Sequence, residues 1–165
     1  MNDFGYYKSI IENLEKVNAT QGENIEKAAS LMADAIANDR LINVYGGGGH
    51  TTLPVGEMFF RAGGLSCINP LMETGLSVFN QALKYLELER TVNYGSSIVK
   101  YYDLKKDDVL IIFHNIGINP ATIDAAEDTA IIFTPFFFAS IAASIVAGLI
   151  PILWKMISTS SFFRS

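Results

Sequence analysis

The segment from Leu41 to Phe60, LINVYGGGGHTTLPVGEMFF, constrains the fold of this chain more than any other. A short apolar run leads into four consecutive glycines, and apolar residues at helical spacing follow. This pattern predicts a buried strand, a tight turn and the start of a helix. Residues without a Cβ let a ligand approach the backbone closely, and the N–H groups at a helix start favour an anion, most often phosphate.

Two nucleotide-binding motifs share this strand, turn and helix layout. The P-loop requires Lys followed by Ser or Thr after its last glycine, and His50 stands at that position. The dinucleotide-binding fingerprint requires GxGxxG, whereas residues 46–51 read GGGGHT. The turn therefore supports neither nucleotide fold, and taken singly it is as compatible with a purely structural turn as with an anion site.

Composition limits the class of protein. A chain of 165 residues suits one domain, and 17 acidic against 12 basic residues argue against nucleic acid as the partner. The single Cys67 excludes an internal disulfide. The sequence contains neither the HxxxH nor the HExxH spacing that would support a metal site. The first residues include no basic n-region of a signal peptide. We therefore expect a cytoplasmic protein without a metal or other cofactor.

Helical and strand patterns alternate along the first three quarters of the chain. Two amphipathic helices are expected before the glycine turn, at 6–17 and 24–38. Strands are expected at 41–45, 65–68 and 109–113, with a loop beginning at Asn69-Pro70, and helices at about 54–62, 78–88, 98–102 and from 120. This alternation implies a parallel sheet. Its ligand would lie beyond the carboxyl ends of the strands, where the loops 46–52 and 114–119 both fall.

These residues resemble the sugar isomerase, or SIS, family of phosphosugar-binding domains, and in particular its small stand-alone bacterial members. The resemblance rests on VYGGGGHTTL with GEMFFRAGG, on INPLME and on DVLIIFHNIGINPATIDAA, and it covers residues 1 to about 126. It implies an α/β fold, a three-layer αβα parallel sheet in flavodoxin-like strand order, a homodimer and a phosphorylated sugar as ligand. Either aldose–ketose isomerisation or sensing of a sugar phosphate without catalysis fits the family.

The resemblance assigns phosphate and sugar binding to the two loops. In the first loop these residues are Gly46, Gly47, Gly48, Gly49, Thr51 and Thr52, and in the second His114, Asn115, Gly117 and Asn119. The family's second loop carries two serines that donate hydroxyls to phosphate, but His114 and Ile116 stand in their places here. Backbone N–H groups, a protonated His114 and the threonines of the first loop are the available substitutes.

Three residues are candidates for acid–base catalysis, since isomerisation needs a base and a donor that polarises the carbonyl. His50 lies beside the predicted helix start and carries an imidazole, a common general acid or base, although a loop histidine serves as often to hold phosphate. Glu57 follows within the helix, and it is equally spaced to pair with Arg61 on the surface. Glu73 follows the INPLM segment at a strand end.

Composition changes abruptly near the end of the chain. Thr129 to Trp154 contain no charged residue, a span longer than the roughly 20 residues that cross a bilayer. This segment is a frame-shifted or divergent end, a membrane anchor of a tethered interaction protein, or a packed soluble tail with a fourth strand at 130–133. We divide the chain into an incomplete SIS-like domain, 1–128, and an apolar tail, 129–165, and expect no recognisable fourth and fifth strands.

Overall fold

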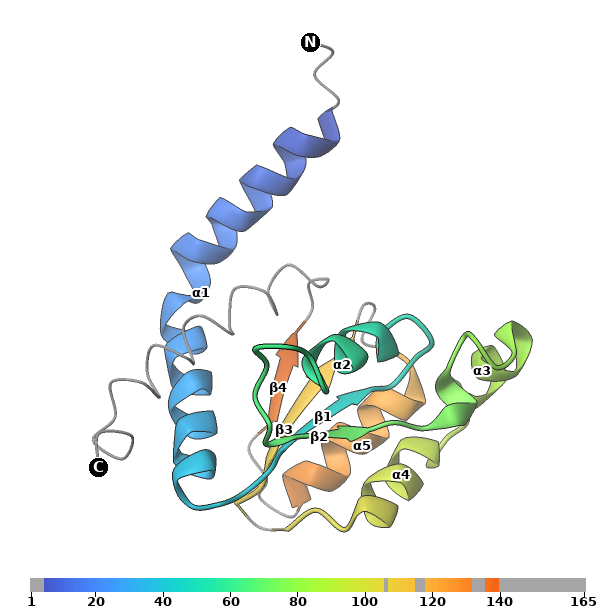
Figure 1. The fold of residues 1–165 in the computed structure, drawn as a ribbon. Coiled ribbons are helices and arrows are strands. Elements are labelled where there is room, and N and C mark those ends of the chain that lie inside the picture. Colours follow the sequence, from blue (N-terminus) through green and yellow to red (C-terminus); the bar gives the residue numbers. More distant parts are fainter. Residues whose placement is uncertain (1–4, 106, 115–117, 132–135, 140–165) are drawn as a thin grey trace.

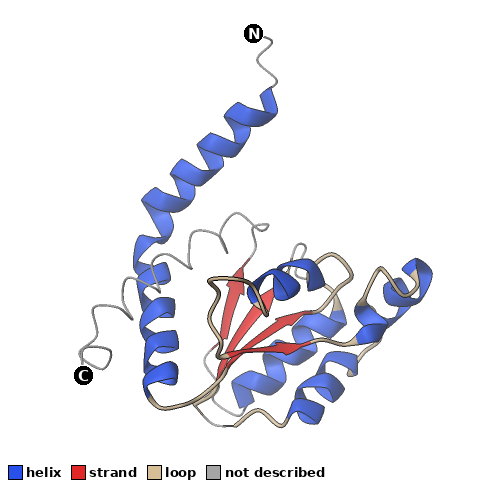
Figure 2. Cartoon of the chain, in the orientation of Figure 1, coloured by secondary structure: helices blue, strands red, loops and turns tan. Residues whose placement is uncertain are grey.

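A four-stranded parallel sheet forms the centre of the protein. The computed structural model describes residues 5–105, 107–114, 118–131 and 136–139. The strands are β1 (Ile42–Gly46), β2 (Ile68–Leu71), β3 (Val109–Phe113) and β4 (Phe136–Ala139), in the order β2-β1-β3-β4. The helices are α1 (Gly5–Ala37), α2 (Thr52–Met58), α3 (Ala82–Leu88), α4 (Tyr94–Tyr102) and α5 (Pro120–Ile131), with a 3₁₀ turn, η1 (Thr74–Leu76). Figures 1 and 2 show helices on both faces of this sheet.

Alternate side chains of each strand enter two separate cores, because successive residues of a strand point to opposite faces. Ile42 and Val44 of β1 join Ala29, Met32, Val55 and Met58 of α1 and α2 on one face. Tyr45 of β1 joins Leu110, Ile112, Ile98 and Ala125 on the other, where α4 and α5 lie (Figure 1). The three-layer αβα arrangement and the flavodoxin-like strand order are therefore confirmed.

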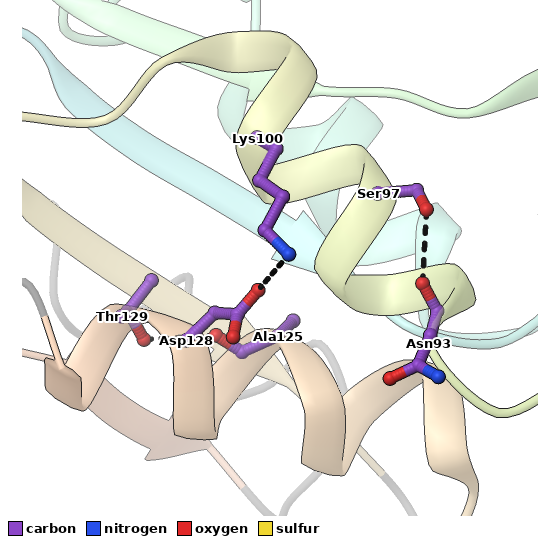
Figure 3. Close-up of polar contacts among 6 residues, drawn as sticks. All are labelled: Asn93, Ser97, Lys100, Ala125, Asp128 and Thr129. Atoms are coloured by element: carbon purple, nitrogen blue, oxygen red, sulfur yellow. Dashed lines mark hydrogen bonds and ion pairs between the residues drawn. The ribbon is translucent and has the colours of Figure 1, made fainter.

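Helices α4 and α5 pack closely on the second face of the sheet. A Cβ on Gly95 would collide with the carbonyl oxygen of Ala121 and lie 3.0 Å from the nitrogen of Ala125. At the other end of the pair, Lys100 reaches across to Asp128 at 3.6 Å (Figure 3). Since Lys100 is largely exposed, this ion pair contributes little, whereas the close approach of the two helices depends on the absence of a Cβ at Gly95.

The first helix differs from the two that we expected. Residues 5–37 form one continuous helix, α1, and the prediction of separate helices at 6–17 and 24–38 is wrong. Gly22, between them, has no atom within 4 Å of a would-be Cβ. A glycine in an exposed helix costs only about 1 kcal/mol relative to alanine, which is too little to end a helix by itself.

Two further boundaries differ from expectation. We expected a strand at 65–68 and a loop at Asn69-Pro70, yet these two residues lie within β2. Proline is tolerated there because β2 is an edge strand with β1 as its neighbour. Helix α2 ends at Met58 rather than near residue 62, since Phe59 is extended and Phe60 has a φ of 52°.

A fourth strand is present where we expected no recognisable one. β4 pairs in parallel with β3, whereas residues 130 and 131, in our alternative placement of a fourth strand, belong to α5. The sequence FFFA lies within a continuous apolar run, which periodicity alone assigns equally well to a helix or to a buried strand. The three readings of the tail concern residues 129–154, of which the structure describes only 129–131 and 136–139. None of the described helices is long and apolar enough to span a bilayer.

Candidate functional site

A cavity of about 210 Å³ lies where the segments following β1 and β3 meet. Gly48, Gly49, His50 and Thr51 line it from the first loop, and His114, Asn119 and Thr122 from the second loop and the start of α5. The remaining lining residues come from α3 and the two residues that follow it: Tyr85, Leu86, Glu89 and Arg90. Both loops that the sequence placed at one edge of the sheet thus contribute to one cavity.

The glycine turn is packed tightly against the rest of the protein. A Cβ on Gly47 would collide with the Thr122 side chain and lie 2.9 Å from Thr122 Cα. On Gly49 it would collide with Val78 and lie 2.7 Å from the Tyr85 ring. On Gly48 it would lie 2.7 Å from Glu89 Oε2. The glycines therefore allow α5 and α3 to approach the turn, so that the turn forms one wall of the cavity.

Hydrogen bonds within the turn use several of the groups that we expected to bind phosphate. The N–H of Gly48 donates to Thr51 Oγ1 at 2.9 Å, and the N–H groups of Thr51 and Thr52 donate to the carbonyl of Gly48. The Thr52 hydroxyl donates to the carbonyl of Gly49 at 2.7 Å. Gly46, Gly47 and Thr52 do not line the cavity. The N–H groups of Gly48, Thr51 and Thr52 are therefore engaged within the turn.

The second loop places two predicted residues in the cavity. His114 is half-buried and lines it together with Asn119. The carbonyl of Asn119 accepts from the N–H groups of Thr122 and Ile123 and so begins α5, which leaves its side-chain amide to the cavity. Asn115 and Gly117 lie outside the described residues.

The end of α3 supplies the residues that sequence reasoning missed. The N–H of Glu89 donates to the carbonyl of Tyr85 at 2.8 Å, and its own carbonyl accepts from the N–H of Ala121 at 3.1 Å. Ala121 in turn accepts from the Tyr45 hydroxyl at 2.9 Å. This chain of bonds ties β1, the first turn of α5 and the end of α3 together. The sequence signal for these cavity residues was weak, because a charged stretch such as ELER at the end of a helix is typical of a solvent-exposed surface.

The carboxylates that we predicted to be catalytic lie elsewhere. Glu57 pairs with Arg61 at 3.1 Å on the surface of α2, with both side chains more than half exposed. Glu73 accepts from the N–H of Gly75 at 2.9 Å and begins η1. Burial, followed by the charge of Glu73, raises the pKa of Tyr94 to about 12. Neither carboxylate lines the cavity.

His50 is the predicted acid–base residue that does reach the cavity. Its ring is exposed and stands edge-on to Tyr85, with the ring centroids 6.4 Å apart. Glu89, by contrast, is only 7% exposed. Within the described residues no group of three or more His, Cys, Asp or Glu side chains is arranged to hold a metal ion. The lining of the cavity therefore includes two histidines, one arginine and one buried glutamate.

Comparison with known proteins identifies the family. A model of the SIS domain matches residues 5–131. The chain belongs to the SIS domain family. This confirms the resemblance drawn from the glycine turn.

Curated relatives of this SIS domain are longer than it is. A UPF0309 protein of Thermoanaerobacter pseudethanolicus is 37% identical over 125 residues, which are 74% of this chain and 50% of the relative. A UPF0309 protein of Geobacillus kaustophilus is 31% identical over 121 residues, 73% of this chain and 48% of the relative. The chain thus spans about half the length of the curated relatives it matches.

Two solved structures share the fold. Phosphoheptose isomerase GmhA from Neisseria gonorrhoeae superposes with a TM-score of 0.63 at 16% identity. A phosphoheptose isomerase from Francisella tularensis gives 0.67 at 12% identity. In both comparisons the match covers 94% of this chain and 96% of the other. At such low identity these structures show a common fold.

Proposed function

We propose that this SIS domain binds a phosphorylated sugar in the cavity between the glycine turn and the end of α3. The observation that carries the proposal is the convergence of Arg90, His50 and His114 on one small cavity. A guanidinium and protonated imidazoles are strong donors to phosphate oxygens. Arg90 is exposed at the cavity, so its guanidinium is accessible to an incoming anion.

The other lining groups suit the sugar. The Asn119 amide and the Thr122 hydroxyl can bond sugar hydroxyls, and Glu89 can accept from them. The volume of about 210 Å³ is below the range of about 300–1,000 Å³ of cavities for drug-sized ligands, which favours a single small sugar. The membership of the SIS family and the fold shared with phosphoheptose isomerases support this ligand class.

Sensing of the sugar phosphate, without aldose–ketose isomerisation, is the second candidate. It is favoured by the positions of Glu57 and Glu73, because both predicted bases are engaged elsewhere. Under this candidate the same ligand enters the same cavity, and the domain senses it.

Titration calorimetry tests the proposal. The full 165-residue chain is titrated with fructose 6-phosphate and sedoheptulose 7-phosphate, and in parallel with fructose and with inorganic phosphate. We expect the sugar phosphates to bind at least about tenfold more tightly than fructose, since each charge-assisted hydrogen bond contributes about 1.5–3 kcal/mol. Equal affinity for fructose, or no heat from any sugar phosphate, would contradict the proposal.

We also propose that two chains pair through the first half of α1. Only Ala29, Met32 and Ala35 of this helix are buried, whereas its first half exposes a row of large apolar side chains: Tyr6, Tyr7, Ile10, Ile11 and Leu14. Tyr6, Ile10 and Leu14 follow one another at steps of four and share one face. A second copy would bury this face. Sedimentation of the full chain should show a dimer that Leu14→Glu dissociates; a monomeric wild type would contradict the pairing.

A further inference from the structure

The aromatic ring of Tyr85 forms part of the cavity wall that α3 supplies. It covers the bare Cα of Gly49, since a Cβ on that glycine would lie 2.7 Å from Cε2 and 2.8 Å from Cζ of the ring. The ring of His50 stands edge-on to it, with the centroids 6.4 Å apart. The Tyr85 ring thus packs on the glycine turn at the edge of the space that a ligand would occupy.

The backbone around Tyr85 is tied to the rest of the protein, although no residue of α3 is fully buried. The N–H of Tyr85 donates to the carbonyl of Gln81 at 3.2 Å, and its carbonyl accepts from the N–H of Glu89 at 2.8 Å. The carbonyl of Glu89 accepts in turn from the N–H of Ala121, which joins this segment to α5. A close-packed wall held in this way yields little to a ligand that is too large.

The hydroxyl of Tyr85 differs from those of the tyrosines in the core on the α4 and α5 face. The hydroxyls of Tyr45 and Tyr102 donate to backbone carbonyls. The hydroxyl of Tyr94 bonds to Glu73. Within the part of the chain that the structure describes, the half-buried Tyr85 has no hydrogen bond from its hydroxyl. The side chain of Tyr85 is therefore positioned by the packing of its ring and not by its polar group.

We propose that Tyr85 determines the length of the sugar phosphate that this domain accepts. The inference rests on the proposed sugar-phosphate site and deepens it. Arg90 supplies the guanidinium for the phosphate, and Tyr85 precedes it by about 7 Å along the direction of α3. A sugar whose phosphate is bound by Arg90 has its far end at the Tyr85 ring. In a cavity of about 210 Å³, a six-carbon sugar phosphate is accepted, and a seventh carbon meets the ring.

Calorimetry on the full chain with fructose 6-phosphate and with sedoheptulose 7-phosphate tests the inference, and the ratio of the two dissociation constants is the readout. One carbon unit in a close-fitting pocket changes affinity by about 10- to 200-fold. We therefore expect the wild type to prefer fructose 6-phosphate by at least about tenfold. Tyr85→Ala removes the ring, and this preference should fall to less than about threefold. Tyr85→Phe keeps the ring and should keep the preference.

Two more variants serve as controls. Leu83→Ala changes a side chain of α3 that is 78% exposed, and it should keep the wild-type preference. Tyr85→Leu retains an apolar contact with Gly49, so it supports α3 even if the alanine variant does not fold. Because leucine has no ring, Tyr85→Leu should also lose most of the preference. Circular dichroism of each variant shows that it is folded.

The outcomes distinguish the inference from the proposed function. If Tyr85→Ala and Tyr85→Leu keep the preference, or weaken both sugar phosphates equally, Tyr85 only supports α3. The inference is then overturned, and the binding site stands. A wild type that binds both sugar phosphates equally well overturns it too. If the wild type binds neither sugar phosphate, the proposed function fails and the inference with it.

Discussion

The segment after β1 and the segment after β2 contribute to the cavity in opposite ways. The first, with its four glycines and α2, has the more conspicuous sequence, but its polar groups largely bond to one another. The second, ending in ELER, has an ordinary sequence, but it places Tyr85, Glu89 and Arg90 in the cavity. A conspicuous turn can thus form one wall of a cavity, while an ordinary helix end supplies charged side chains to it.

The largest expected effect tests the glycine turn as a wall. Gly47→Ala would bring a Cβ within 2.9 Å of backbone atoms of Thr122, which cannot move without shifting α5. We expect the free energy of unfolding to fall by about 3 kcal/mol, measured by urea denaturation.

Gly22→Ala is the matched control for this change, because nothing lies within 4 Å of its added Cβ. It should stabilise α1 by up to about 1 kcal/mol. If both glycine variants behaved alike, the turn would not be packed as described.

The next effect tests the charged end of α3. Arg90→Ala removes the guanidinium that lines the cavity, and we expect the affinity for a sugar phosphate to fall by about 2 kcal/mol. Arg61→Ala removes an exposed guanidinium just beyond the end of α2 and should leave affinity unchanged. Calorimetry on both variants shows which of the two segments binds the phosphate. A larger loss of affinity for Arg61→Ala than for Arg90→Ala would contradict the comparison.

A smaller effect tests the bond that joins the two segments through α5. Tyr45→Phe removes the hydrogen bond to the carbonyl of Ala121 and should lower the free energy of unfolding at pH 7 by about 0.5–1.5 kcal/mol. Tyr101→Phe, at an exposed tyrosine, is the control and should have little effect.

The same tyrosine should make the protein sensitive to alkali. Burial raises the pKa of Tyr45 above its usual value, and the pKa of Tyr94 is raised to about 12. Because the folded state favours the neutral phenols, their stabilisation is complete below pH 10 and is lost as the pH rises from about 10 through 12. Unfolding measured at pH 7 and pH 11 should show a smaller alkaline loss in Tyr45→Phe than in the wild type.

The smallest effect concerns Glu57. Its exposed ion pair with Arg61 is of a kind that contributes about 0–1 kcal/mol. Glu57→Gln should therefore change stability by less than about 0.5 kcal/mol and leave binding intact. A loss of binding equal to that of Arg90→Ala would show that α2 takes part in ligand binding.

Sequence patterns predicted the frame of the molecule and some of the residues that line its cavity. The run Val109–Phe113 was predicted with the bounds that β3 has, because a short apolar run between charged residues and a polar loop leaves few alternatives. His50 and Asn119 were found because they follow strands whose carboxyl ends share one edge. Glu89 and Arg90 could not be found in this way, since helical periodicity does not say which cavity the end of a helix will meet.

Where the secondary structure predicted from the sequence was wrong, the surrounding tertiary structure determined the conformation. Asn69-Pro70 was predicted to begin a loop, but the outer side of an edge strand has no neighbouring strand, so the N–H that proline lacks is not needed there. The residues between 17 and 24 were left outside the two predicted helices, yet α1 continues through them. In both cases a local signal of modest free energy was outweighed by the surrounding structure.

Backbone amide NMR of the full chain, titrated with fructose 6-phosphate and with sedoheptulose 7-phosphate, tests the central claim most directly. If the cavity between the glycine turn and the end of α3 holds the ligand, the amides of Gly49, His50, Glu89 and Arg90 should shift together and saturate at one concentration. Shifts confined to α2 around Glu57 and Arg61, with Glu89 and Arg90 unmoved, would contradict it.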